Sequence, residues 1–190
     1  DIELFKFAGI MYFRPTGQSL AVSEEGEGEP AAFPESVSDL PPVAALLDGA
    51  PLQLHEALKD RLLVDDTFGL ESTYQPAMAS LILHGDRSNP DSEPLPHKLY
   101  CIPVMQPDHQ TREHDEHMPD EVFFEDRIHI AVRRMFEGSG DVPAQAPTVK
   151  VINLSIGDTA REFIHTPSPW ARLLDWLAYR HRVLFCVSAG

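Results

Sequence analysis

Short apolar runs alternate with amphipathic stretches along the chain from Val43 onward. A short run rich in β-branched residues predicts a strand, whereas apolar residues spaced three and four apart predict a helix. Strands that alternate with helices form βαβ crossovers, which give a parallel sheet covered on both faces. We therefore predict a doubly wound α/β fold with a mostly parallel sheet. The predicted strands are residues 43–47, 62–64, 99–104, 148–154 and 183–187, and the predicted helices are residues 54–60, 77–83, 121–137 and 169–181.

Two of the predicted helices have clear start signals. Pro119 and Asp120 precede the helix at 121–137, and Ser168 is a capping residue before the helix at 169–181. Their apolar residues recur at helical spacing, which is typical of a face packed on a core. These residues are Val122, Phe123, Ile128, Val132, Met135 and Phe136 in the first helix, and Trp170, Leu173, Leu174 and Leu177 in the second.

Length and charge narrow the class of protein. The 190 residues are 43% apolar, enough for one sizeable core. Lys and Arg total 15 against 30 Asp and Glu, a net charge of −15, which repels nucleic acid and anionic lipid. No apolar run is long enough to span a membrane, and the amino terminus lacks a signal-peptide pattern. We predict a soluble, cytoplasmic protein with no nucleic-acid or membrane partner.

The chain divides into an amino-terminal segment and one main domain. Residues 1–41 contain the acidic, Gly-rich stretch 23–29, which is typical of a solvated linker, and this segment is a candidate docking site for a protein partner. Residues 42–190 form the predicted domain. Cys101 and Cys186 each lie in an apolar, strand-like run, which predicts buried free thiols in a reducing compartment.

Asp48 is the first candidate for chemistry. It follows the apolar run 43–47 and precedes Gly49, so it lies at the carboxyl end of a predicted strand, where ligands of open α/β sheets collect. Three roles are open for it: a catalytic or phospho-accepting carboxylate, a metal ligand, or a turn former. The small residues at 153–158 and 187–190 allow another backbone to approach and pair with a strand end.

In their order along the chain, these segments resemble the amino-terminal part of the catalytic domain of subtilisin-like serine peptidases. The resemblance runs from about Pro42 to Gly190 and includes the Asp48 strand, the helix 77–82, the strand 151–157 and the end 187–190. It implies a sheet that is incomplete at its carboxyl-terminal side, a peptide or protein substrate, and no cofactor. It further implies that Asp48 orients a catalytic imidazolium. The implied substrate-binding residues are Ser155, Ile156 and Gly157, which would pair with the peptide, and Ser188, Ala189 and Gly190, which would line a specificity pocket.

The sequence departs from that family at two places. Where the family has His-Gly-Thr ahead of the helix, this chain has Tyr74-Gln75-Pro76, and a phenol is no substitute for an imidazole base at neutral pH. The sequence also stops at Gly190, before the expected oxyanion Asn and nucleophilic Ser. Either a His-bearing stretch is missing near residues 74–76, or the domain is not proteolytic. In both cases we expect this chain alone to hydrolyse no peptide bond, because only the carboxylate of the triad is present.

Other histidines are weaker candidates. His84 follows the predicted helix 77–83 instead of opening it, so it lies about 10 Å from the place of a catalytic base. His55 is interpreted as a surface or capping residue. Residues 108–117 hold three His and four acids, but they match no zinc-site spacing, and we expect no metal there.

Three functions remain open at this point. The leading one is a serine endopeptidase of subtilisin type, and the second is an inactive module of the same fold that binds peptide or protein by strand pairing. The third is a phospho-accepting or nucleotide-binding domain that uses Asp48 or the pair Asp65 and Asp66, although the chain has neither phosphate-binding glycine motif. The first two require Asp48, Ser155 and Ser188 to lie at one edge of the sheet.

Overall fold

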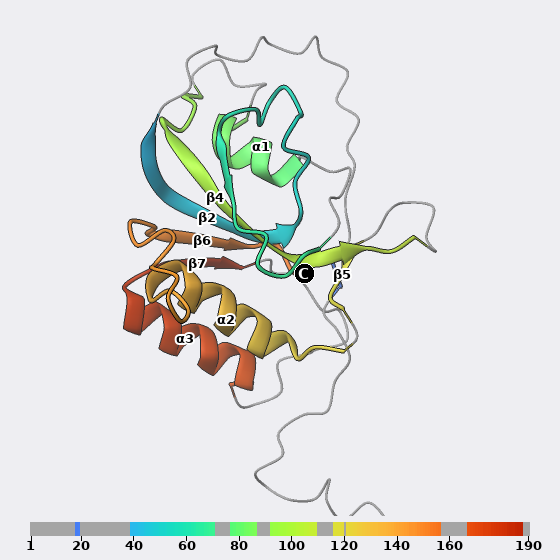
Figure 1. The fold of residues 1–190 in the computed structure, drawn as a ribbon, viewed down its shortest axis with the longest axis vertical. Helices are drawn as coiled ribbons and strands as arrows, with labels where there is room; N and C mark the ends of the chain where they lie inside the picture. Colours follow the sequence, from blue (N-terminus) through green and yellow to red (C-terminus); the bar gives the residue numbers. More distant parts are fainter. Residues whose placement is uncertain are drawn as a thin grey trace, which may run out of the picture.

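The centre of the fold is a seven-stranded sheet, with β2 in the middle of its parallel part (Figure 1). A computed structural model of the chain describes residues 18–19, 39–70, 77–86, 92–109, 116–119, 121–156 and 167–187. The strands are β1 (Gln18–Ser19), β2 (Leu40–Gly49), β3 (Leu62–Val64), β4 (His97–Pro107), β5 (Glu116–His117), β6 (Val151–Leu154) and β7 (Leu184–Val187). The helices are α1 (Ala77–His84), α2 (Phe124–Phe136) and α3 (Pro169–His181).

Five of the strands run parallel, which confirms the predicted doubly wound α/β fold. The order in space is β1-β5-β4-β2-β6-β7, and β3 pairs with the first half of β4. On β2, Leu46 is opposite Cys101 of β4 on one side and Asn153 of β6 on the other. After β2 the chain builds β3 and β4 on one side, and it then returns on the other side with β6. The direction of winding therefore reverses between β2 and β6, at the kind of position where α/β proteins bind ligands.

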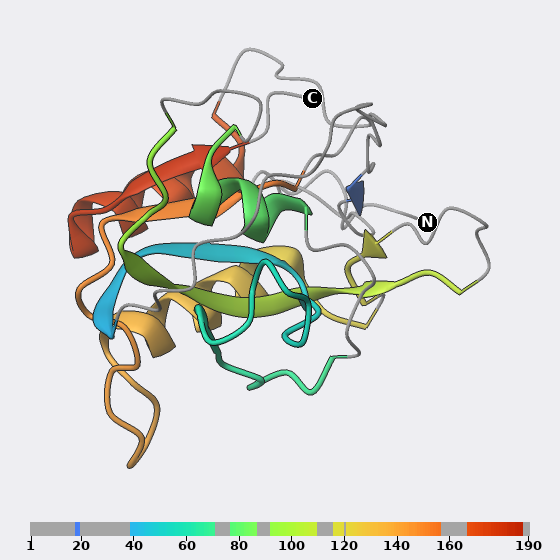
Figure 2. The same ribbon diagram turned by 90° about the horizontal axis from the view of Figure 1, so that it is seen from above.

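The sheet is covered on both faces, as the continuous apolar runs of its strands predict. Helices α2 and α3 cover one face, and α1 covers the other together with the turns that follow β2 (Figures 1 and 2). Alternation along β2 divides its side chains between the two cores: Ala45 and Leu47 face α2 and α3, whereas Leu46 faces α1. The central strand is thus buried on both faces and paired along both edges.

Local chemistry explains where the carboxyl-terminal helices begin. Helix α3 has the predicted bounds because the Ser168 hydroxyl accepts a hydrogen bond from the Ala171 N–H at 3.0 Å, and Pro169 follows that cap. Helix α2 begins three residues later than predicted. The Val122 N–H donates to the Pro119 carbonyl at 3.3 Å, so these residues form a turn before the helix.

The predicted helix at 54–60 is wrong. In the structure these residues form consecutive turns, in which the Leu58 and Lys59 N–H groups both donate to the His55 carbonyl. The segment then bends at Asp60, which has a left-handed φ of 62°. Ala57 and Leu58 are nevertheless fully buried beneath α1. The apolar spacing that predicted a helix therefore marks buried turns.

A partly buried ion pair connects the end of β3 to α2. Arg134 of α2 binds Asp65 with both ends of its guanidinium: Nε lies 3.1 Å from Oδ2 and Nη2 lies 3.0 Å from Oδ1. The Tyr100 hydroxyl of β4 donates to the same carboxylate at 2.8 Å. The side chains of Asp65 and Arg134 are 9% and 17% exposed, so this contact lies largely out of water. Three elements are held together at one carboxylate.

We expect Asp65→Ala to lower the free energy of unfolding by about 3 kcal/mol, because it leaves the Arg134 charge and the Tyr100 hydroxyl without their shared partner. Urea unfolding monitored by circular dichroism measures the effect. Asp66→Ala is the matched control, since Asp66 is the exposed neighbour, and it should change stability by less than about 0.5 kcal/mol. Equal losses in the two variants would contradict this role for Asp65.

Candidate functional site

Asp48 and Ser155 lie at the same side of the sheet, where the parallel strands have their carboxyl ends. Leu47 of β2 pairs with Leu154 of β6 in parallel register. Asp48 and Ser155, which follow these two residues, therefore lie at the same end of the two strands. The opposite neighbour of Asp48 is Pro103 of β4, and the register shifts at the next pair, where Gly49 is opposite Met105. One residue of β4, Val104, is therefore left out of the ladder beside Asp48, an irregularity of the β-bulge kind.

The residues that follow β6 have distinct surroundings. The Ser155 hydroxyl donates to Oδ1 of Asn153 at 2.6 Å, and the Ile156 side chain is 5% exposed in the core beside α2 and α3. The described ladder of β6 ends at Leu154, with β2 on one side and β7 on the other. A peptide therefore cannot pair with residues 151–154, because β2 and β7 already occupy both sides of this strand. Gly157, Ser188, Ala189 and Gly190 lie outside the described residues.

Helix α1 runs against the direction of the strands. Its last turn lies near the start of β4, because the Leu95 N–H donates to the Leu83 carbonyl at 2.8 Å. The start of α1 therefore lies toward the end of the sheet where β2 ends, as Figure 2 shows. The segment 74–76, where a catalytic base was expected, lies outside the described residues.

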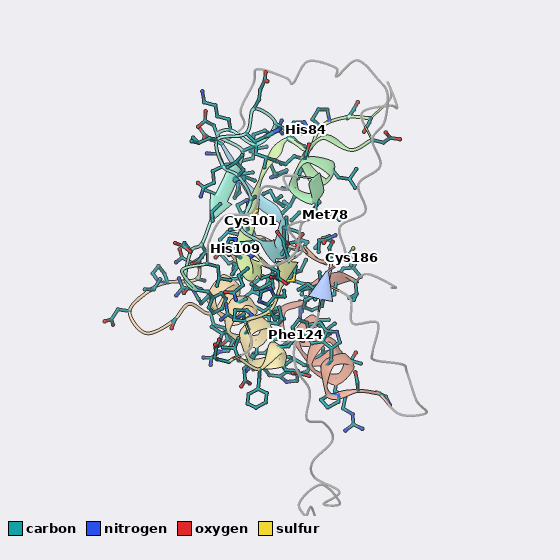
Figure 3. All side chains as sticks on the ribbon, turned by 90° about the vertical axis from the view of Figure 1, so that its right-hand side faces the viewer. Met78, His84, Cys101, His109, Phe124 and Cys186 are labelled. Atoms are coloured by element: carbon teal, nitrogen blue, oxygen red, sulfur yellow. The ribbon has the colours of Figure 1, made fainter. Side chains whose placement is uncertain are left out.

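The structure gives His84 and His55 local structural roles. His84 is 5% exposed at the far end of α1, where its Nε2 lies 2.7 Å from the Ala57 carbonyl oxygen (Figure 3). Nδ1 of His55 accepts a hydrogen bond from the Ala57 N–H at 3.2 Å, so His55 stabilises the turns at 54–60 and caps no helix there. His84 is therefore remote from the site that Asp48 marks.

Glu116 is the site residue that sequence reasoning missed. Its carboxyl is hydrogen-bonded to that of Asp48, although the two residues are far apart in the chain. The Glu116 carboxylate also lies directly against Gly49, where a Cβ atom would overlap all three of its atoms. Gly49 is therefore required for this contact, since any side chain there would displace Glu116. Two acidic groups meet at the end of the central strand.

This contact changes the ionisation of Asp48. Burial of the carboxyl is the largest cause, and the nearby Glu116 charge adds to it, so the pKa of Asp48 rises from its ordinary 3.8 to about 7. A hydrogen bond from the Gly49 backbone N–H acts in the opposite direction. Burial also raises the pKa of the Cys101 thiol on β4, with a smaller contribution from the Asp48 charge. The site thus holds a proton near neutral pH.

The neighbour of Glu116 completes a small polar group. Nε2 of His117 lies 3.2 Å from Nε2 of Gln106 on β4, whereas the buried Nδ1 of His117 has no hydrogen-bond partner. Residues 110–115 of the acidic, His-containing stretch lie outside the described residues. Among the residues that the structure describes, no three His, Cys, Asp or Glu side chains are grouped so as to hold a metal ion.

The two cysteines differ from the prediction in one respect. Cys101 is buried in β4 as expected, but Cys186 is exposed on β7 (Figure 3). Leu184 of the same strand is 62% exposed as well. In the described part of the chain, no helix is long and apolar enough to cross a bilayer.

The second pair of candidate acids has a different role. The Asp65 carboxylate is already occupied by Arg134 and Tyr100, so this residue stabilises the fold and is not available as a phospho-acceptor. Asp66 is exposed beside it. Of the acids proposed from sequence, Asp48 alone lies at the point where the winding of the sheet reverses.

Comparison of the chain with protein-family models and with curated protein sequences gave no match.

The raised pKa of Asp48 predicts how stability depends on pH. The folded state binds one more proton than the unfolded state between pH 4 and pH 7, so this group favours folding below pH 4, and its contribution is lost as the pH rises through 7. We expect the stability of the wild type relative to Asp48→Asn to fall over that interval by at most about 4 kcal/mol, because one pKa unit corresponds to about 1.4 kcal/mol.

Urea unfolding of both proteins at several pH values measures this difference. Asp39→Asn is the control, since Asp39 lies just before β2 with a side chain that is 97% exposed, and it should give a nearly constant offset from the wild type. A constant offset for Asp48→Asn as well would show that Asp48 does not hold a proton in the folded state.

Proposed function

We propose that the chain belongs to a serine endopeptidase of subtilisin type, in which Asp48 is the carboxylate of an Asp/His/Ser triad. The observation that supports this most directly is the position of Asp48 at the carboxyl end of the central strand, where the start of α1 and Ser155 also lie. By the resemblance drawn from sequence, these three features correspond to the triad carboxylate, to the helix that carries the base, and to the strand end that pairs with substrate. Asp48 is the triad member that we assign within this chain.

The proposed chemistry uses the burial of Asp48. In such a triad the serine hydroxyl attacks the scissile carbonyl, the imidazole takes its proton, and the carboxylate orients and stabilises the imidazolium. A positive imidazolium beside Asp48 favours the ionised carboxylate and opposes the effects that raise its pKa. A desolvated carboxyl is well suited to that task, since its interaction with the cation is weakly screened.

The proposed path of the substrate follows β6 beyond its paired part. Ser155 and Ile156 follow the end of the ladder, and the buried Ile156 side chain anchors this segment while its backbone can pair with an extended peptide. Gly157 continues the same segment, and Ser188, Ala189 and Gly190 follow β7 at the neighbouring strand end. We propose this set as the substrate-binding residues.

A second candidate is an inactive module that binds peptide or protein by strand addition. Two observations favour it: the sequence Tyr74-Gln75-Pro76 at the place of the base, and the position of β7 at the end of the described sheet. Among the described strands β7 pairs on one side only, with β6, and Leu184 and Val187 of this edge are 62% and 44% exposed. An exposed apolar edge strand is a template for another strand.

The peptidase hypothesis is tested with the natural-length protein that contains this chain. We expect it to cleave a mixed peptide library, with products identified by mass spectrometry, and we expect Asp48→Asn to lower kcat by about 10⁴-fold, because the imidazole loses its orienting anion. Asp39→Asn, at the other end of the same strand, should leave the rate unchanged. Residues 1–190 alone should cleave nothing. No cleavage by the natural-length protein, or cleavage that survives Asp48→Asn, would exclude this mechanism.

The binding hypothesis is tested with residues 1–190 and the same peptide library, by affinity capture followed by titration calorimetry of the enriched peptides. We expect Leu184→Lys to weaken binding at least tenfold, because a charge on the β7 edge opposes strand addition. The matched control is Leu81→Lys on α1, where Leu81 is 53% exposed and off the sheet edge. Equal effects of the two substitutions would argue against binding at β7.

A further inference from the structure

Strand β5 is held against β4 by few contacts. It has two residues, which pair on one side with the two residues of β1, Gln18 and Ser19. On the other side their partners on β4 are Gln106 and Pro107, the second of which has no N–H to donate. The side-chain contact between Gln106 and His117 adds one polar interaction at 3.2 Å. Beyond these, the hydrogen bond between Glu116 and Asp48 connects β5 to the end of β2. This connection is the one that depends on a proton, because two ionised carboxylates have no hydrogen to share.

We propose that Asp48 and Glu116 form a proton-dependent latch: one shared proton holds Glu116 against the end of β2, and loss of that proton releases it. With the proton present, a carboxyl O–H donates to a carboxylate, which is among the stronger kinds of hydrogen bond in proteins. Without it, two negative charges face each other in a partly buried site and repel. The two states differ in the position of the Glu116 side chain.

The groups around Asp48 support this behaviour. Glu116 acts on it from β5, and the Cys101 thiol lies close enough on β4 to be affected by its charge; both are acids, so neither stabilises a second negative charge. Burial keeps the Cys101 thiol protonated at neutral pH. His117 of β5 has its Nε2 beside Gln106. The pKa of Asp48, about 7, then sets the pH at which the latch opens.

The surroundings also limit how far the latch can open. Met118, next to β5, is fully buried in the core, so the chain is anchored immediately after His117. On the other side, Gly49 offers no side chain that would keep Glu116 in place once the proton is lost. Among the described residues, release is therefore confined to Glu116 and His117. Met118 is the fixed point about which they move.

The latch affects chemistry because Glu116 occupies the carboxyl group of Asp48, which any other partner of Asp48 must contact. If the proposed peptidase function holds, Glu116 competes with the catalytic imidazole for Asp48, and opening of the latch at higher pH makes the carboxylate available. That consequence rests on the proposed function. The latch itself does not, since it requires only the two carboxyl groups and the protein as folded.

Hydrogen exchange of residues 1–190 tests the latch directly. Peptides that contain β5 are followed by mass spectrometry at pH 6 and pH 8, with rates corrected for the intrinsic pH dependence of exchange. We expect protection of β5 in the wild type to fall at least tenfold between these values, with a midpoint near pH 7, while protection of β6 stays constant. In Glu116→Gln the amide donates to Asp48 without a second charge, so β5 should stay protected at both pH values.

The control variant is Glu121→Gln, an exposed acid a few residues beyond β5, which should retain the wild-type pH dependence. Circular dichroism at each pH confirms that every variant is folded. Protection of β5 that does not change with pH in the wild type, or that still falls in Glu116→Gln, would overturn the latch. Because this readout is independent of activity, failure of the peptidase hypothesis leaves the result unaffected, and failure of the latch leaves that hypothesis open.

Discussion

The pairing of β2 on both of its edges is the constraint on which the rest of the structure depends. Because β4 and β6 occupy the two edges and helices cover the two faces, the central strand reaches solvent only at its ends. A polar residue can be tolerated near the end of such a strand, and Asp48 lies just after the last residue that pairs with β6. The same pairing aligns the end of β6 with the end of β2, which brings Ser155 to the same edge. One constraint thus produces both the core and the candidate site.

The contact between Asp48 and Glu116 opposes stability once both carboxyl groups are ionised. A desolvated carboxyl that faces a second carboxyl favours the protonated form and costs free energy once it ionises. An uncharged residue at position 116 would remove the part of that cost that comes from the second charge, whereas the part that comes from burial of Asp48 would remain. Such unfavourable arrangements are concentrated at functional sites, where a shifted pKa or an accessible charge is useful. The cost itself is therefore an argument that this end of the sheet has a function.

The sequence predicted most helices and strands well, but it did not predict contacts between residues that are far apart in the chain. The strand 62–64 and the helix 169–181 have their predicted bounds, because apolar periodicity and the Ser168 cap are local signals. The apolar residues of the turns at 54–60 have the spacing of a helix, because consecutive turns can bury the same side chains that a helix would bury. Glu116 was noticed only as part of an acidic stretch. Its contact with Asp48 depends on how β5 folds back on β4, which no local pattern in the chain encodes.

Asp65 and Asp48 show why position in the sequence alone does not assign a role. Each carboxylate lies at or just after the end of a parallel strand, and sequence placed both among the candidates for chemistry. Asp65 meets the guanidinium of Arg134 in a two-point contact, so its charge is matched and its geometry fixed. Asp48 meets another acid, so its charge is unmatched and its proton is exchangeable near neutral pH. A matched carboxylate has no further partner to seek, whereas an unmatched one at an accessible strand end can still accept a cation. The difference in partners, not in placement, separates the structural acid from the candidate functional one.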